Sequence, residues 1–77
     1  MTDYSNWLLT WFKERTPNIQ LAPDENYFDA GAIDSLGIIE LIEDLENTFS
    51  IEFTQTDFQD RRFVNIAGLT AIIKEKI

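Results

Sequence analysis

Ser35 is the residue of this chain whose type and position best suit a chemical role. It stands at the expected start of a helix, preceded by Asp34 and followed by Leu36. A helix N-terminus favours anions and offers unpaired backbone N–H groups, so a phosphodiester esterified to the Ser35 hydroxyl would be tolerated there. The residues themselves leave a plainer alternative open, in which Ser35 only helps to cap the helix.

The chain contains neither histidine nor cysteine, which excludes several classes of chemistry. It has no imidazole base, no thiolate nucleophile and none of the usual zinc ligands. Hydrolysis by a Ser-His or Cys-His pair is therefore excluded, and we predict a protein that is not an enzyme and binds no metal. An EF-hand calcium loop also fails, because neither a start at Asp24 nor one at Asp29 gives the required ligands and glycine.

Acidic residues dominate the charge of the chain. Fourteen acidic and six basic residues give a net charge of −8, and the stretch from Thr16 to Asp60 has no Lys or Arg but eleven acids. Such a surface disfavours nucleic acid and anionic membranes, and it favours partner proteins with basic docking surfaces. Solubility alone is the alternative explanation of the charge.

A first helix is predicted between a cap at Thr2 or Asp3 and a stop at Thr16-Pro17. Its apolar stripe consists of Tyr4, Trp7, Leu8, Trp11 and Phe12. Residues 18–34 show no sustained period, so we predict a long ordered loop. Loops of that length inside a compact domain are uncommon and usually functional, and this one leads directly to Ser35.

The clearest helix is predicted over residues 35–49, capped by Asp34. Its buried stripe consists of Ile38, Leu41, Ile42, Leu45 and Phe49, and its polar face of Glu40, Glu43, Glu46 and Asn47. Leu36 and Ile39 lie near its N-terminal end, at the edge of the polar face. These two apolar residues are left for something else to cover.

The remaining residues predict an extended segment and two more helices. Ile51 and Phe53 alternate with polar residues but have no second strand to pair with. A capping box at Thr56–Gln59 predicts a short third helix that ends near Arg61. Asn65 caps a last helix with the apolar residues Ile66, Leu69, Ile72, Ile73 and Ile77. The sequence thus predicts a single all-α domain over residues 1–77, a four-helix bundle with a long first loop and a short third helix.

The segment around Ser35 also carries a family signature. It reads Phe28-Asp-Ala-Gly-Ala-Ile-Asp-Ser-Leu36, and Glu40-Leu41, Leu45-Glu46 and Phe49 follow it. In these residues and their spacing the chain resembles the acyl carrier protein family. The resemblance continues through Asp57 and the final apolar helix, so it covers essentially the whole chain.

The resemblance implies an acyl-carrier-type bundle that holds substrates and catalyses nothing. A phosphopantetheinyl transferase would attach 4′-phosphopantetheine from coenzyme A to Ser35, and the thiol of that arm would hold an acyl group as a thioester. Asp34 would support the modification reaction. Leu36 and Ile39 would contact partner enzymes, and Glu40 and Glu46 would pair with their Arg or Lys side chains. Weak individual pairs suit a carrier that visits several enzymes.

Departures from the family pattern indicate which carriers are most similar. Housekeeping fatty-acid carriers usually lack the Ile33 inserted before Asp34, have an acid in place of Gly37, and have an apolar partner contact in place of Glu43. Residues 57–65 look more like stand-alone carriers of secondary pathways and D-alanyl carrier proteins. We nevertheless predict that Glu43 contacts partner enzymes, as Glu40 and Glu46 do.

Several points stay open at this stage. The load is a fatty, polyketide or other specialised acyl group, or alternatively an aminoacyl or peptidyl group that includes D-alanyl; an unmodified acidic helical adaptor is a third reading. The lack of cysteine and of any long apolar run leads us to expect a cytoplasmic protein. We expect it to be a monomer.

Overall fold

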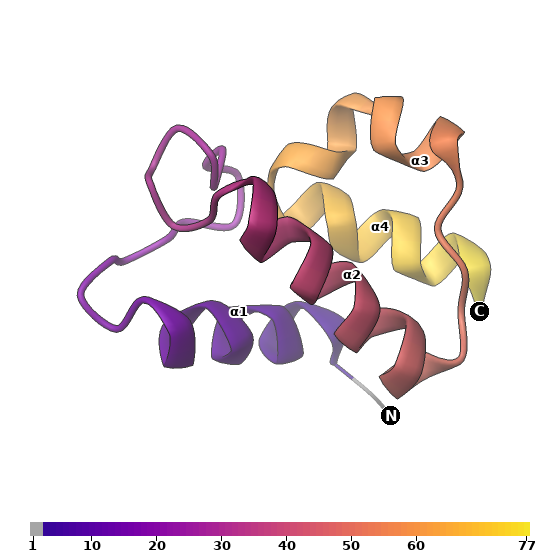
Figure 1. Ribbon diagram of the computed structural model, residues 1–77, viewed down its shortest axis with the longest axis horizontal. Helices are drawn as coiled ribbons and strands as arrows, with labels where there is room; N and C mark the ends of the chain where they lie inside the picture. The colour runs from indigo at the N-terminus through magenta and orange to yellow at the C-terminus, as the bar shows by residue number, and fades with distance from the viewer. Residues whose placement is uncertain (1–2) are drawn as a thin grey trace.

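Helices make up all the regular structure in the computed structural model of the chain, which describes residues 3–77 (Figure 1). The α-helices are α1 (Tyr4–Arg15), α2 (Ser35–Phe49), α3 (Gln55–Gln59) and α4 (Ile66–Lys76), with a 3₁₀ helix, η1 (Arg61–Val64), before the last. The prediction of an all-α fold with four helices and a short third one is confirmed. None of these helices is long and apolar enough to cross a membrane.

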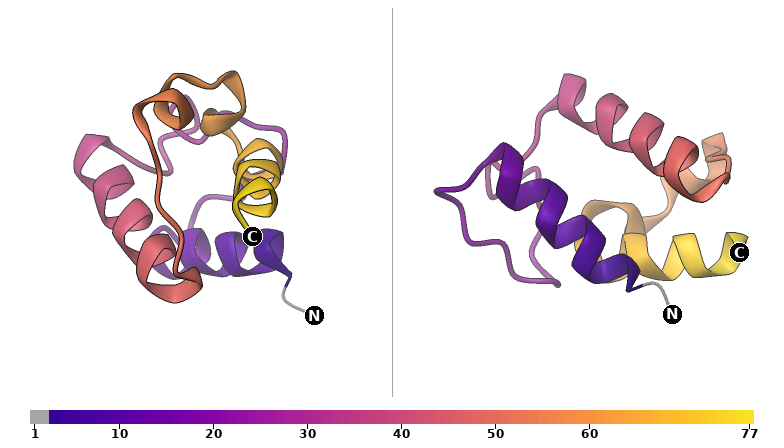
Figure 2. Two further views of the ribbon diagram at one scale, coloured as in Figure 1. Left: turned by 90° about the vertical axis from the view of Figure 1, so that its right-hand side faces the viewer. Right: turned by 90° about the horizontal axis from the view of Figure 1, so that it is seen from below.

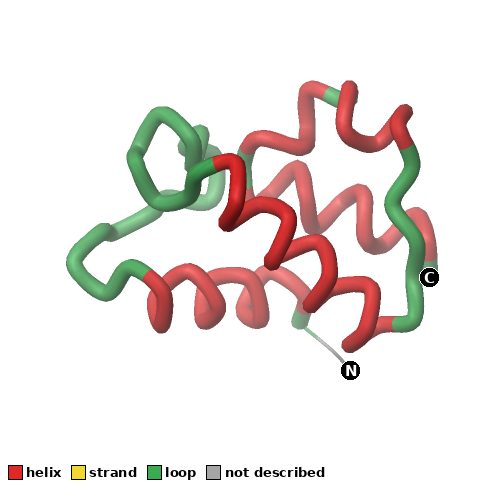
Figure 3. The backbone as a smooth tube through the Cα atoms, viewed as in Figure 1, coloured by secondary structure: helices red, strands yellow, loops and turns green. Residues whose placement is uncertain are grey.

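The helices surround a common interior. Viewed from the end in Figure 2, α1, α2 and α4 form three sides, and α3 with η1 closes the fourth. The loop over residues 16–34 gathers at the end of the molecule where α2 begins (Figure 3). This arrangement places Ser35 where the loop meets the first turn of α2.

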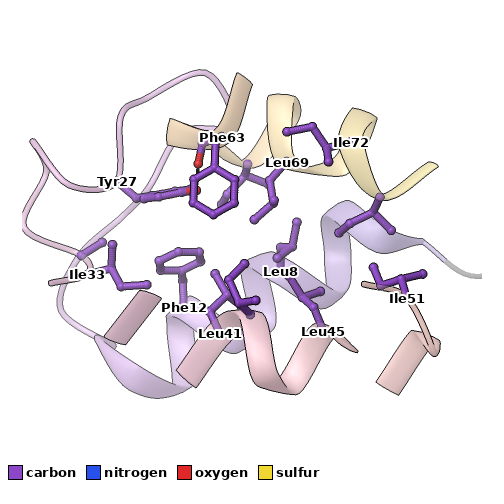
Figure 4. Close-up of a cluster of buried hydrophobic side chains, with 14 residues drawn as sticks. Leu8, Phe12, Tyr27, Ile33, Leu41, Leu45, Ile51, Phe63, Leu69 and Ile72 are labelled. Carbon is purple, nitrogen blue, oxygen red and sulfur yellow. Dashed lines mark hydrogen bonds between the residues drawn. The ribbon is translucent and has the colours of Figure 1, made fainter. Parts of the chain in front are cut away.

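Buried side chains from α1, α2, η1, α4 and the loops meet in that interior (Figure 4). The helices contribute Leu8, Phe12, Leu41, Ile42, Leu45, Phe63, Ile66, Leu69, Ile72 and Ile73. The loops contribute Tyr27, Ala32, Ile33 and Ile51. Removal of this apolar surface from water is the main force that holds so small a domain together. Because the long loop supplies part of the core, it is ordered as predicted.

Tyr27 fastens the long loop to η1. Its side chain is fully buried, its hydroxyl donates a hydrogen bond to the Phe63 carbonyl, and its backbone N–H donates to the Val64 carbonyl at 3.0 Å. Burial raises the pKa of the Tyr27 phenol above its usual range. The phenol therefore stays neutral and serves as a structural donor.

The predicted helix caps are largely confirmed. Asp3, Asp34 and Asn65 each accept a hydrogen bond from the backbone N–H three residues further on, which satisfies a donor that the helix leaves unpaired. Thr2, the other candidate for the first cap, lies outside the described residues. Thr16 closes α1, because its backbone N–H and its hydroxyl both donate to the Phe12 carbonyl.

The prediction of the third helix was wrong in its boundaries. The capping box is formed by Thr54 and Asp57, so α3 begins at Gln55 and ends at Gln59, and η1 follows it. Two hydroxyl residues could start this helix. Thr54 does so because its partner is a carboxylate, which is a strong acceptor and is also paired with Lys76 at 2.6 Å.

Some predicted core residues lie at its edge. The centre of the α2 stripe is buried, but Ile38 and Phe49 at its ends are half-buried. Phe49 packs edge-on against Tyr4, with ring centroids 5.1 Å apart. Ile77 was predicted on the apolar stripe of the last helix, but it lies beyond the end of α4 and is 64% exposed. Because α4 ends at Lys76, Ile77 lies outside the helical register that directs the apolar stripe to the core.

Candidate functional site

Ser35 is the first residue of α2 and is exposed to solvent. Asp34 precedes it as the N-cap, and its carboxylate accepts a hydrogen bond from the backbone N–H of Gly37 at 2.7 Å. The side-chain hydrogen bonds described for residues 3–77 do not involve the Ser35 hydroxyl. The structure therefore presents this hydroxyl freely at a helix N-terminus, where a negatively charged substituent is favoured.

The loop before Ser35 needs a glycine at position 31. Gly31 has φ 75°, in the left-handed region that side chains disfavour, and no atom lies within 4 Å of the place where its Cβ would be. The Asn26 side chain accepts hydrogen bonds from the backbone N–H groups of Phe28 and Asp29. These contacts turn the chain so that Ala32 and Ile33 enter the core just before Asp34.

The side of α2 that carries Ser35 also borders a hollow. With 3.6 residues per turn, Ile38 and Ile39 lie about one turn, or about 5.4 Å, along the axis from Ser35. The hollow has a volume of about 450 Å³ and is lined by Phe28, Ile38, Ile39, Ile42, Glu43, Phe58, Phe63 and Val64. Its lining comes from the long loop, α2, α3 and η1, and Glu43 is its one charged residue.

Three large exposed apolar side chains line this hollow, and Leu36 lies beside one of them, Ile39, by helical spacing. Leu36 is 66% exposed, Ile39 55%, Phe58 49% and Phe28 38%. The predicted exposure of Leu36 and Ile39 is confirmed, while Phe28 and Phe58 were not singled out from the sequence. A group of exposed apolar side chains beside an exposed serine is typical of a surface that another molecule covers.

The structure separates the predicted partner-binding acids from one another. Glu43 is exposed at the hollow. Glu40 pairs with Arg15 of α1 at 2.5 Å. Glu46 is half-buried and accepts a hydrogen bond from the backbone N–H of Phe53 at 2.9 Å. Placing Glu46 simply on the solvent side was therefore a simplification, because part of its role is to fix the chain that follows α2.

An ion pair and the aromatic contacts of Phe58 attach α3 to the bundle, with the Phe58 ring centroid 5.3 Å from that of Phe63. No residue of α3 is buried, and its Asp57 pairs with Lys76 of α4. Burial raises the pKa of Asp57, but hydrogen bonds from Lys76 and Thr54 outweigh it, so the net pKa is lowered. Nearby, Arg62 bridges Asp60 and Glu75, and its hydrogen bonds lower the pKa of both carboxyls. These pairs hold one wall of the hollow.

Comparison with known proteins decides what this arrangement is. Residues 7–73 match the family described as the phosphopantetheine attachment site. The chain belongs to this family. The resemblance seen in the sequence is thus confirmed, and phosphopantetheine is the prosthetic group for which this family is described.

Curated relatives of the chain include D-alanyl carrier proteins. One from Streptococcus uberis is 40% identical over 52 residues, which cover 68% of this chain and 66% of the relative. One from Streptococcus pyogenes serotype M1 is 54% identical over 35 residues, which cover 46% of this chain and 44% of the relative. The matched part thus spans less than half the length of the S. pyogenes relative. The predicted closeness to D-alanyl-type carriers is confirmed.

Arg15 is the residue of this region that sequence reasoning missed. It ends α1, and the structure brings it onto the acidic side of α2. The only signal in the sequence is its position four residues after Trp11, which places both on one face of α1. Nothing in the sequence indicates that this face meets Glu40. Within residues 3–77 no group of three or more possible metal ligands occurs.

Proposed function

We propose that Ser35 is the attachment point of 4′-phosphopantetheine and that this carrier holds acyl groups as thioesters on that arm. The residues present fit the group, because the Ser35 hydroxyl is exposed at the first position of α2 and no side chain closes over it. The chain has no cysteine, so the thiol is what the bound group supplies. The exposed serine at the helix start is the observation that carries the proposal.

The neighbours of Ser35 hold it in place for modification. The Asp34 carboxylate fixes the first turn of α2 through its bond to the Gly37 N–H. In our proposal Asp34 also supports the transfer reaction, and Leu36, which is 66% exposed, contacts the transferase. The chain has no histidine or cysteine to serve as a base. The serine is accordingly a substrate of another enzyme and acts as no catalyst itself.

Partner enzymes would dock on the side of α2 beside the hollow. Leu36 and Ile39 offer apolar contacts there, and Glu43 offers a negative charge. A partner of matching chemistry presents apolar side chains next to a Lys or Arg. Glu40 and Glu46 stand at the edges of this surface, and they stay predictions as partner contacts because each is bonded within the chain.

Two classes of load have specific support. The similarity to D-alanyl carrier proteins favours an aminoacyl load, D-alanine in particular. The hollow of about 450 Å³ beside Ser35, with its apolar lining, favours a short apolar acyl chain instead. We propose a carboxylic acid load joined as a thioester in either case, and the two loads differ in which activating enzyme delivers them.

Intact mass spectrometry tests the attachment. The apo protein is incubated with a broad-specificity phosphopantetheinyl transferase and coenzyme A, alongside Ser35→Ala and Ser5→Ala. We expect one arm's mass on the wild type and on Ser5→Ala, and none on Ser35→Ala. No addition to the wild type would leave the unmodified adaptor, and an equal addition to Ser35→Ala would place the arm elsewhere.

A second experiment separates the loads. The modified protein is offered D-alanine with ATP and a D-alanine-activating ligase, and in parallel short fatty acids with an acyl carrier protein synthetase. A hydroxylamine-sensitive mass increase in only one reaction assigns the load. If neither reaction gives a thioester although the arm is present, both proposed loads are wrong while the attachment stands.

A further inference from the structure

One ion pair among residues 3–77 reaches α2, and it joins Glu40 to Arg15 of α1. The Nη1 atom of Arg15 lies 2.5 Å from the Glu40 carboxylate. The C-terminal end of α1 and the N-terminal end of α2 lie at the same end of the molecule, as Figure 2 shows. Arg15 therefore places a positive charge beside α2, a helix that contains acidic residues and no Lys or Arg.

The surroundings of the Arg15 guanidinium also favour this position. It stands over the Trp11 ring, 5.0 Å from the centroid. The Trp11 indole N–H donates to Asp44 at 2.8 Å, which ties the ring to α2. The Arg15 Nε lies 3.5 Å from the point where a Cβ on Gly37 would be, so the glycine leaves room for the guanidinium. Stacking on an aromatic face is a favoured environment for arginine.

The Arg15–Glu40 ion pair makes the acidic residues of α2 unequal in their availability to a partner's cation. Glu40 lies towards α1, on the side of α2 that also carries Gly37 and Asp44, because these residues repeat at helical spacing. Glu43 lies one turn further along the same polar face, at the edge that borders the hollow. A cation from a partner must compete with Arg15 for Glu40, but it meets no such competitor among the described contacts of Glu43.

We propose that Arg15 determines docking specificity by withholding Glu40 from basic partners and directing them to Glu43. The inference rests on the proposed function, because it concerns enzymes that dock beside Ser35. The partner it fits carries a Lys or Arg opposite Glu43, next to the apolar side chains that cover the hollow. A partner with its positive charge placed opposite Glu40 is disfavoured by the fixed charge of Arg15.

The test measures transfer of the arm by a broad-specificity phosphopantetheinyl transferase with coenzyme A at low salt. Arg15→Gln frees Glu40, so we expect KM for the carrier to fall by about three- to tenfold with little change in kcat, as complementary charge affects encounter. Lys13→Gln is the matched control. It makes the same charge change in the last turn of α1, at a residue that lines a different hollow together with Pro17 and Ile19, and we expect a change below about twofold.

Two more variants connect the effect to Glu40. Arg15→Lys keeps a cation beside Glu40 and should return KM towards the wild-type value. In a Glu40→Gln background, Arg15→Gln should act no more strongly than Lys13→Gln. Equal effects of Arg15→Gln and Lys13→Gln, a rise of KM in Arg15→Gln, or persistence of its effect without Glu40 would each overturn the proposal.

If circular dichroism shows that Arg15→Gln does not fold, two other variants still test the proposal. Glu43→Gln should then raise KM more than Glu40→Gln does, and the reverse order would contradict the proposal. Failure of the underlying function looks different, because the wild type itself would then gain no mass in the transferase reaction. A modified wild type with the wrong order of variants refutes only the role of Arg15.

Discussion

Ile33 packs against Gly37 across the start of α2, with its Cγ1 atom 2.9 Å from the position that a Cβ on Gly37 would occupy. Asp34 Oδ1 lies 3.1 Å from the same position. Two sequence features that look independent, the isoleucine before Asp34 and the glycine after Leu36, are therefore one packing arrangement. It leaves Ile33 buried and lets the Asp34 cap close beneath Ser35.

This arrangement predicts energetic coupling between the two positions. Gly37→Ala should lower the free energy of unfolding by about 1 kcal/mol, because overpacking costs about 1–3 kcal/mol and the better helix propensity of alanine returns about 1. In an Ile33→Ala background the same change should become stabilising. Urea unfolding of all four proteins, in sucrose to keep the weakest folded, gives the coupling. Additive effects would show that the two side chains do not compete for space.

Glu46 should matter for stability, unlike its neighbour Glu43. Glu46→Ala removes the acceptor of the partly buried Phe53 N–H, and we expect a loss of about 1 kcal/mol in the free energy of unfolding. Glu46→Gln keeps an acceptor oxygen and should lose less. Glu43→Ala, exposed and without such a bond, should stay within about 0.5 kcal/mol of the wild type in chemical denaturation. Equal losses in the two alanine variants would contradict the assignment.

Replacement of Gly68 should destabilise the protein, because a side chain at this position would collide with the backbone of Arg62. A Cβ there would lie 2.1 Å from the Arg62 carbonyl oxygen, where α4 begins beneath η1. Helix propensity alone predicts that Gly68→Ala gains about 1 kcal/mol, but the overpacking costs about 1–3 kcal/mol and backbone must move, so we expect a net loss of up to about 2 kcal/mol. Ala71→Gly in the same helix is the control and should show the propensity cost by itself. A more stable Gly68→Ala, measured by thermal unfolding, would mean that α4 and η1 are less close.

The ion pairs that join α3, η1 and α4 predict a loss of stability in acid. Asp57, Asp60 and Glu75 have lowered pKa values in the folded protein. A group with a lowered folded pKa contributes stability that is fully present above its unfolded pKa, about 4, and that disappears as pH falls through the folded value. Tm should therefore fall below about pH 4.

Two comparisons test this explanation of the acid effect. Asp57→Asn should flatten the dependence of Tm on pH, because one of the linked carboxyls is gone. Added salt should weaken the effect, since Glu75 and Arg62 are substantially exposed. An unchanged pH dependence in Asp57→Asn would remove Asp57 from the explanation.

The sequence by itself determined the local structure around Ser35. The bounds of α2, its Asp34 cap and the exposure of Leu36 and Ile39 follow from helical periodicity and from a hydrogen bond between residues three apart. Such contacts depend only on neighbouring residues, so the order of the residues is enough to predict them. The family signature is likewise a contiguous stretch, so the family could be recognised from the order of the residues.

The tertiary structure alone decided which side chains of different elements meet. Arg15 is 25 residues from Glu40 and Trp11 is 33 from Asp44, and only the packing of α1 against α2 joins them. The pairing of Asp57 in the cap of α3 with Lys76 of α4 likewise joins residues far apart in the chain. Helical spacing tells which residues share a face, but the partner of that face is set by how all the apolar stripes pack together.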